Sequence, residues 1–99
     1  MNYRLAIIED DNLLRENYTD VFGRQGYLVD AYSNREQAQE VFQSRLPDLA
    51  IIDIGLGDEV DGGFALCQWL RAKSRTLPII FLQVLLRVTL IQSYKIQQL

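Results

Sequence analysis

Residues 49–54 read Leu-Ala-Ile-Ile-Asp-Ile, the most continuous apolar run in the first half of the chain. A short, uninterrupted apolar run is typical of a strand that is buried on both faces of a sheet. One carboxyl group, that of Asp53, lies near the carboxyl end of this run. Because burying an unpaired carboxylate is costly, we expect Asp53 to be paired or functional.

Three further segments resemble strands, and helical patterns separate them. Residues 5–8 are apolar and end abruptly in three acids, residues 27–32 are less apolar and suit a place nearer an edge, and residues 77–82 form another buried run. Apolar residues recur at helical spacing in 12–25, around 38–42 and in 64–73. Strands that alternate with helices predict a parallel sheet with right-handed crossovers, an open α/β fold with helices on both faces.

Capping residues indicate where the first two helices begin and end. Asp11 or Asn12 can cap the start of the first helix, and Gly26 can close its end. Ser33, followed three residues later by Glu36, has the spacing of a capping box for the second helix. The inward stripe expected on the second helix consists of Ala38, Val41 and Phe42. Pro47 and Asp48 mark the next turn, and residues 55–63 read as a loop.

Composition narrows the classes of function. Ninety-nine residues supply one core and hence one domain. A net charge of −3 offers no electrostatic footprint for nucleic acid. No apolar run approaches the roughly 20 residues that a membrane helix needs. The single Cys67 and the lack of a signal-like N-terminus predict a cytoplasmic protein. From its charge and its short apolar runs, we expect this chain by itself to bind neither nucleic acid nor membrane.

Three acids are expected at one edge of the predicted sheet. Ligands of open α/β sheets bind outside the carboxyl ends of the strands, where Glu9, Asp10 and Asp53 all fall. Like charges at close range require a cation, and a cluster of carboxylates without histidine favours Mg²⁺ over zinc or copper. With such a cation, Asp53 is suited to attack a phosphoryl group and form an acyl phosphate.

The first strand end (residues 7–11), Asp53 and the Asp61–Phe64 loop together resemble the receiver domain of bacterial response regulators. The resemblance covers residues 1–82 and implies a flavodoxin-like, doubly wound parallel sheet. It also implies that Asp53 accepts a phosphoryl group from a sensor histidine kinase. Mg²⁺ would be bound by Asp10 and Asp53 directly, by Glu9 through water and by the backbone carbonyl of Gly55.

The sequence departs from this family after Leu82. A Ser or Thr is expected at the end of the fourth strand, where Gln83 stands, and Lys95 follows too soon to serve as the family's lysine. Residues 83–99 contain no Asp, Glu, Gly or Pro and carry a charge of +2, against −5 for the residues before them. This segment predicts a truncated or frame-shifted receiver, incomplete after its fourth strand, with an apolar extended tail. Such a tail could swap or pair in a homodimer.

Two other functions remain open at this point. A small phosphatase with an aspartate nucleophile is one, although such enzymes place a second Asp where this chain has Gly55. A degenerate dimerisation domain that keeps the acids without using them is the other. The acids after residue 8 also suit a plain solvated turn at a helix N-terminus. Gly62 and Gly63 are equally compatible with a simple turn and with a phosphate site.

Overall fold

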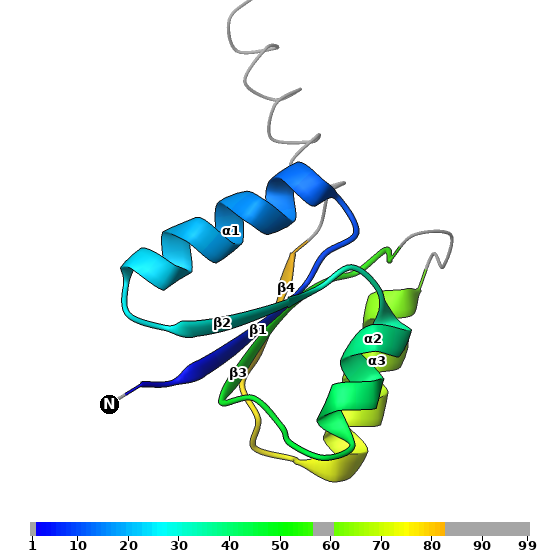
Figure 1. Cartoon of the computed structure of the whole chain (residues 1–99). Helices are drawn as coiled ribbons and strands as arrows, with labels where there is room; N and C mark the ends of the chain where they lie inside the picture. The colour runs from blue at the N-terminus through cyan, green and yellow to red at the C-terminus, as the bar shows by residue number, and fades with distance from the viewer. Residues whose placement is uncertain (1, 57–60, 83–99) are drawn as a thin grey trace, which may run out of the picture.

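A computed structural model describes residues 2–56 and 61–82 of the chain. Strands and helices alternate throughout this part, as the sequence predicts (Figure 1). The elements are β1 (Arg4–Ile8), α1 (Asn12–Arg24), β2 (Leu28–Tyr32), α2 (Arg35–Phe42), β3 (Leu49–Asp53), α3 (Gly62–Lys73) and β4 (Ile79–Leu82). The strands and helices predicted up to Leu82 all form, and several of their ends coincide with the predicted ones, while most others differ by one or two residues.

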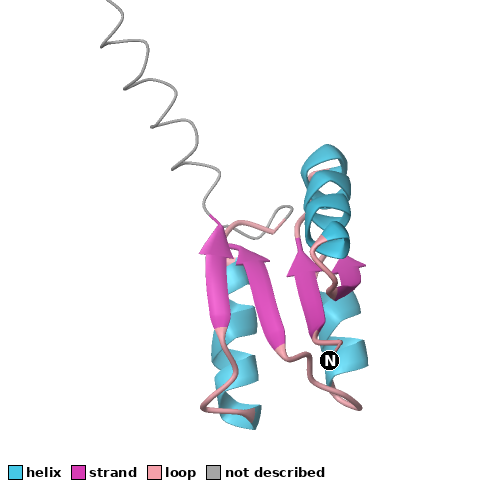
Figure 2. Ribbon diagram, turned by 90° about the vertical axis from the view of Figure 1, so that its left-hand side faces the viewer, coloured by secondary structure: helices cyan, strands magenta, loops and turns pink. Residues whose placement is uncertain are grey.

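The four strands form one parallel sheet in the order β2-β1-β3-β4 (Figure 2). The less apolar β2 lies at an edge, which confirms its expected place. From β1 the chain goes first to one side of the sheet and then to the other, so the topological switch point lies between β1 and β3. In this pair Ile8 is level with Ile52, and the two strands therefore end side by side.

Helices cover both faces of the sheet, as expected (Figure 1). Alternate residues of a strand point to opposite faces, so β1 and β3 each contribute to two cores. The core beneath α2 and α3 contains Ala6, Ile8, Ala38, Phe42, Ala50, Ile52, Leu56, Leu66, Leu70 and Leu77. The core beneath α1 is smaller and contains Leu5, Ile7 and Ile51, with Tyr18 and Phe22 of the helix packed against them.

Helix α1 has the two expected terminal signals. The carboxylate of Asp11 accepts a hydrogen bond from the Leu14 amide at 3.0 Å, which settles the choice between Asp11 and Asn12 as N-cap. At the other end Gly26 has φ of +99°, and its amide donates to the Gly23 carbonyl. The Tyr27 amide donates to the Phe22 carbonyl, which completes a Schellman motif. The Phe22 and Tyr27 rings meet edge to face at 6.2 Å.

The predicted capping box of α2 is wrong by one residue. Asn34 is the N-cap, and its side chain accepts a hydrogen bond from the Gln37 amide at 2.8 Å. The Gln37 side chain accepts in turn from the Ser33 amide and hydroxyl. Asn and Ser are equally good N-cap residues, so the sequence does not distinguish a helix capped by Ser33 from one capped by Asn34. Of the expected stripe, Ala38 and Phe42 are buried, whereas Val41 is 40% exposed.

The expected loop after β3 ends earlier than predicted, because α3 begins at Gly62 and includes Gly63. On β4, Ile80 lies level with Ile51 of the α1 face and is 50% exposed. The predicted extended tail, its swapped dimer, Gln83 and Lys95 all lie outside the described residues. None of the helices within the described residues is long and apolar enough to span a membrane.

Candidate metal and phosphoacceptor site

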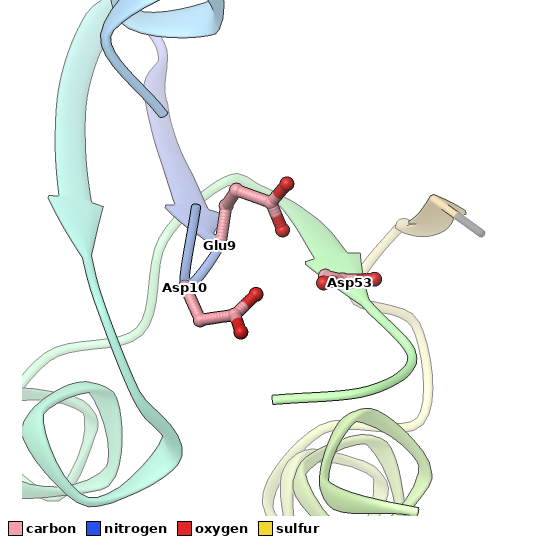
Figure 3. Close-up of side chains that lie close together, drawn as sticks. All are labelled: Glu9, Asp10 and Asp53. Carbon is pink, nitrogen blue, oxygen red and sulfur yellow. The ribbon is translucent and has the colours of Figure 1, made fainter. Parts of the chain in front are cut away.

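The structure brings together the three acids that the sequence singles out. Glu9 follows the last residue of β1, Asp10 is the next residue, and Asp53 ends β3. Figure 3 shows the three carboxyl groups around one space at the carboxyl ends of these strands. One carboxylate oxygen from each residue lies within 4.8 Å of the others. This is the switch point of the sheet, where open α/β folds bind their ligands.

Two of these carboxyl groups are buried and the third is exposed. Glu9 is 1% exposed and Asp53 2%, while Asp10 faces solvent. Glu9 Oε2 and Asp53 Oδ2 are buried and have no hydrogen-bond partner. Buried polar atoms are ordinarily hydrogen-bonded, so two such oxygens facing one acidic space indicate a position for a cation. A plain solvated turn does not account for them.

Burial raises the pKa of both buried carboxyl groups. The pKa of Glu9 is raised to about 8, first by desolvation, then by a hydrogen bond with Asp53 and by the negative charges of Asp53, Asp10 and Asp11. The pKa of Asp53 is also raised, again chiefly by burial and further by a hydrogen bond with Asp10 and the negative charge of Asp10, while hydrogen bonds from Glu9 and from the backbone of Gly55 act against that rise. Without a cation the pair therefore keeps a proton on Glu9 near neutral pH, and that proton supports the Asp53 carboxylate.

The donor set fits a hard divalent cation. Three carboxylates supply oxygen only, and Mg²⁺ prefers one or two carboxylates with additional carbonyl or water ligands. Gly55 stands two residues after Asp53, and its backbone lowers the pKa of the Asp53 carboxyl group through a hydrogen bond. The structure thus places all four sequence-predicted positions in one neighbourhood.

Gly63 is a residue of this site whose role the sequence did not reveal. Its amide donates to the Ile54 carbonyl at 2.6 Å, so the start of α3 lies against the end of β3. A Cβ at this position would lie 2.6 Å from the Ile54 Cα and closer still to the carbonyl oxygen of Asp53. This glycine permits close contact between the backbones of α3 and β3, a requirement that neither of the two sequence interpretations included.

A profile described as the response regulator receiver domain matches residues 5–93, continuing past Leu82. The chain belongs to the response regulator receiver domain family. A receiver domain accounts for the parallel sheet and for acids at the ends of β1 and β3, as the sequence resemblance implied.

Two curated relatives of this receiver domain are similar over 79 residues, 80% of the chain. The Transcriptional regulatory protein PhoP of Escherichia coli O157:H7 is 37% identical, and the Two-component response regulator PhoP of Pseudomonas aeruginosa is 35% identical. Among solved structures, the non-phosphorylated HemR receiver domain from Leptospira biflexa has a TM-score of 0.74 and 27% identity. That match covers 82% of this chain and 64% of the HemR chain. The chain spans about a third, 34%, of the length of the two PhoP relatives.

Proposed function

We propose that this receiver domain is a phosphorylation-controlled switch whose Asp53 accepts a phosphoryl group from a sensor histidine kinase. The observation that carries the proposal is the buried Asp53 carboxylate with its partnerless Oδ2, placed beside two further acids at the switch point of the sheet. A carboxylate is an established nucleophile for forming an acyl phosphate. Membership of the family supports a kinase as the donor.

The proposed cation is Mg²⁺. Asp10 and Asp53 would bind it directly, Glu9 through a water molecule, and Gly55 through its backbone carbonyl. The partnerless oxygens of Glu9 and Asp53 support this set, since a cation would satisfy both. When bound, Mg²⁺ would neutralise charge on the transferring phosphoryl group, which is most of what this chemistry requires. Because Glu9 is protonated near neutral pH without the cation, binding would release a proton to solvent.

In the proposed transfer, a carboxylate oxygen of Asp53 attacks phosphorus. The new O–P bond forms as the P–N bond of the kinase phosphohistidine breaks, and the imidazole nitrogen keeps the electron pair. The chain is thus stoichiometrically modified and acts as a switching module rather than as an enzyme with turnover. Its net charge of −3 and the apolar runs of its sequence support a cytoplasmic protein that binds neither nucleic acid nor membrane by itself.

Signalling is expected to be impaired. The receiver proper would comprise residues 1–82, and Gln83 offers no hydroxyl group of the kind expected after the fourth strand. Lys95 stands too close after that strand to neutralise the acyl phosphate. A frame shift after codon 82 would explain both features. Translating the coding DNA in the other frames tests this, because a Thr-Ala run followed by Lys-Pro supports it and unrelated sequence contradicts it.

We also propose that the apolar segment 83–99 joins two copies of the chain in a homodimer. A strand swap, in which each copy pairs this segment with the other copy, is one form that such a dimer can take. Light scattering over a concentration series measures this directly. A mass that rises to that of a dimer is the expected result, and a monomer mass at every concentration contradicts the proposal.

The test of the phosphoacceptor is incubation with acetyl phosphate and Mg²⁺, followed by intact mass spectrometry. We expect one added phosphoryl group, sensitive to hydroxylamine, which is lost in Asp53→Asn and kept in Asp20→Asn. Asp20 suits as control because it pairs with Arg24 on the exposed face of α1. An adduct that persists in Asp53→Asn would overturn the assignment of Asp53.

The same assay separates the alternative functions. Sustained release of phosphate would instead favour an aspartate phosphatase. Absence of both the adduct and any cation-dependent change in Trp69 fluorescence would favour a degenerate dimerisation domain.

A further inference from the structure

Arg15 of α1 braces the turn that carries two of the three acids. One nitrogen of its guanidinium, Nη1, donates to the Glu9 carbonyl at 2.8 Å and lies 3.5 Å from the Asp10 carbonyl. The other, Nη2, donates to the Asn12 side chain at 2.5 Å. One planar group therefore connects the end of β1 with the start of α1.

The Glu9 backbone is held from two sides. Its amide donates to the Tyr32 carbonyl of β2 at 3.0 Å, and its carbonyl accepts from Arg15. The sheet thus fixes one side of this peptide, and only the Arg15 side chain reaches its carbonyl among the hydrogen bonds that the structure describes. The direction in which the Glu9 and Asp10 side chains leave the backbone depends on these peptides.

We propose that Arg15 is a positioning residue for the cation site, because its hydrogen bonds to the Glu9 and Asp10 carbonyls hold both carboxyl groups toward Asp53. The inference rests on the cation site proposed above and adds a residue that itself touches neither cation nor phosphoryl group. Groups that orient metal ligands from outside the ligand set commonly affect metal affinity by about 10- to 100-fold.

Arg15 does not act as a counter-ion for the buried acid. The hydrogen bonds that the structure describes for its guanidinium go to two backbone carbonyls and to the Asn12 side chain, and none of them goes to the Glu9 carboxyl group. The guanidinium is directed at backbone carbonyls instead. A planar fork suits this task, because it can reach several acceptors at once, and the single ammonium of lysine cannot.

The two possible roles of Arg15 predict opposite effects on cation binding. If only its charge mattered, Arg15→Met would tighten binding of Mn²⁺, an oxygen-seeking substitute for Mg²⁺, because a positive charge near the site is removed. If it positions the acids, the same change weakens binding. Arg15→Lys separates the roles further, since it keeps the charge and loses the fork.

Titration of the full chain with Mn²⁺, followed by electron paramagnetic resonance, measures the dissociation constant. We expect Arg15→Met and Arg15→Lys each to weaken binding about tenfold. Arg24→Met is the matched control, because it removes the same charge from the exposed end of α1 and is expected to change affinity less than twofold. Arg15→Lys decides the question if Arg15→Met does not fold.

Metal-free NMR supplies a readout that a general loss of stability would not produce. We expect the carbonyl carbon signals of Glu9 and Asp10 to shift in Arg15→Lys, while the amide signals of residues 19–24 stay in place. Unchanged Mn²⁺ affinity, tighter binding or unmoved carbonyl signals would each overturn the role of Arg15. A wild-type chain that binds no Mn²⁺ would instead refute the proposed cation site itself.

Discussion

Carboxyl oxygens of Glu9 and Asp53 lie within 4.8 Å of each other, and both side chains are almost completely buried. Such a pair cannot hold two negative charges in the absence of a cation, so one proton stays between the strands. A proton and a divalent cation are therefore alternative ways of neutralising the same site. Stability, metal affinity and pH are linked through this pair.

The first prediction concerns the pH dependence of stability without metal. Glu9 has a pKa of about 8 in the fold, above its ordinary value of 4.5. Between these values the folded chain holds a proton that the unfolded chain has lost, so the free energy of unfolding falls as pH rises from about 4.5 to 8. The proton on Glu9 contributes at most about 1.4 kcal/mol per pH unit to this slope. The raised pKa of Asp53 acts with the same sign.

Urea denaturation at a series of pH values, with a chelator present, measures this slope. Glu9→Gln should flatten it and should stabilise the chain at pH 8, because a neutral amide can still donate to Asp53. Asp20→Asn, on the exposed face of α1, should leave the slope unaltered. Stability that rises across this window in the wild type would contradict the shared-proton account.

The second prediction is that Mg²⁺ stabilises the fold more at pH 8 than at pH 6. At the lower pH the cation must displace a proton from Glu9, and metal binding that releases protons weakens as pH falls. At a hundredfold excess over the dissociation constant, the stabilisation is about 2.7 kcal/mol. Thermal unfolding with and without Mg²⁺ at both pH values checks it. Equal shifts at the two pH values would show that no proton is displaced.

The third prediction concerns the contact of α3 with β3. Gly63→Ala should destabilise the fold by about 1–3 kcal/mol or more, because the added methyl group meets the backbone of Asp53 and Ile54, which cannot rotate away. Gly23→Ala is the control, since a Cβ there meets nothing within 4 Å and alanine favours a helix. Denaturant midpoints of the two variants should move in opposite directions.

The fourth prediction separates lack of space from backbone conformation. At Gly26 a Cβ would also meet nothing within 4 Å, yet φ is +99°. Gly26→Ala should therefore cost about 1–2 kcal/mol through strain alone. If its stability instead matches that of Gly23→Ala, the Schellman turn does not require glycine. Calorimetric unfolding of both variants provides the comparison.

Much of this fold can be predicted from hydrophobic periodicity. The buried runs that end in Glu9 and Asp53 identify β1 and β3, and parallel strands bring their carboxyl ends to one edge. The site acids follow from the same reasoning, because a carboxylate placed at the end of an apolar run has few structural explanations. The residue types and the direction of the strands are enough to predict β1, β3 and the acids at their ends.

The remaining features depend on distances that one sequence does not contain. Asn34 and Ser33 are both good caps, and only the finished backbone selects Asn34. Gly63 is required because the end of β3 lies against it. In the sequence, a pair of glycines that permits such a contact cannot be told from a pair that forms a turn. Arg15 reaches back over one helical turn to carbonyl groups, for which its own neighbours in sequence provide no signal.

The register between β1 and β3 makes this site sensitive to insertions and deletions. With Ile8 level with Ile52, the Glu9 side chain leaves its strand toward the same face as Asp53. Deleting a single residue within residues 5–8 would turn every later side chain of that strand to the opposite side. A deletion would bring Asp10 level with Asp53 in place of Glu9, because three acids follow β1 in succession, whereas an insertion would bring Ile8 there. During evolution, an insertion can thus remove the acid pair without any substitution of an acid, and conversely the pair can persist through extensive exchange of one aliphatic residue for another.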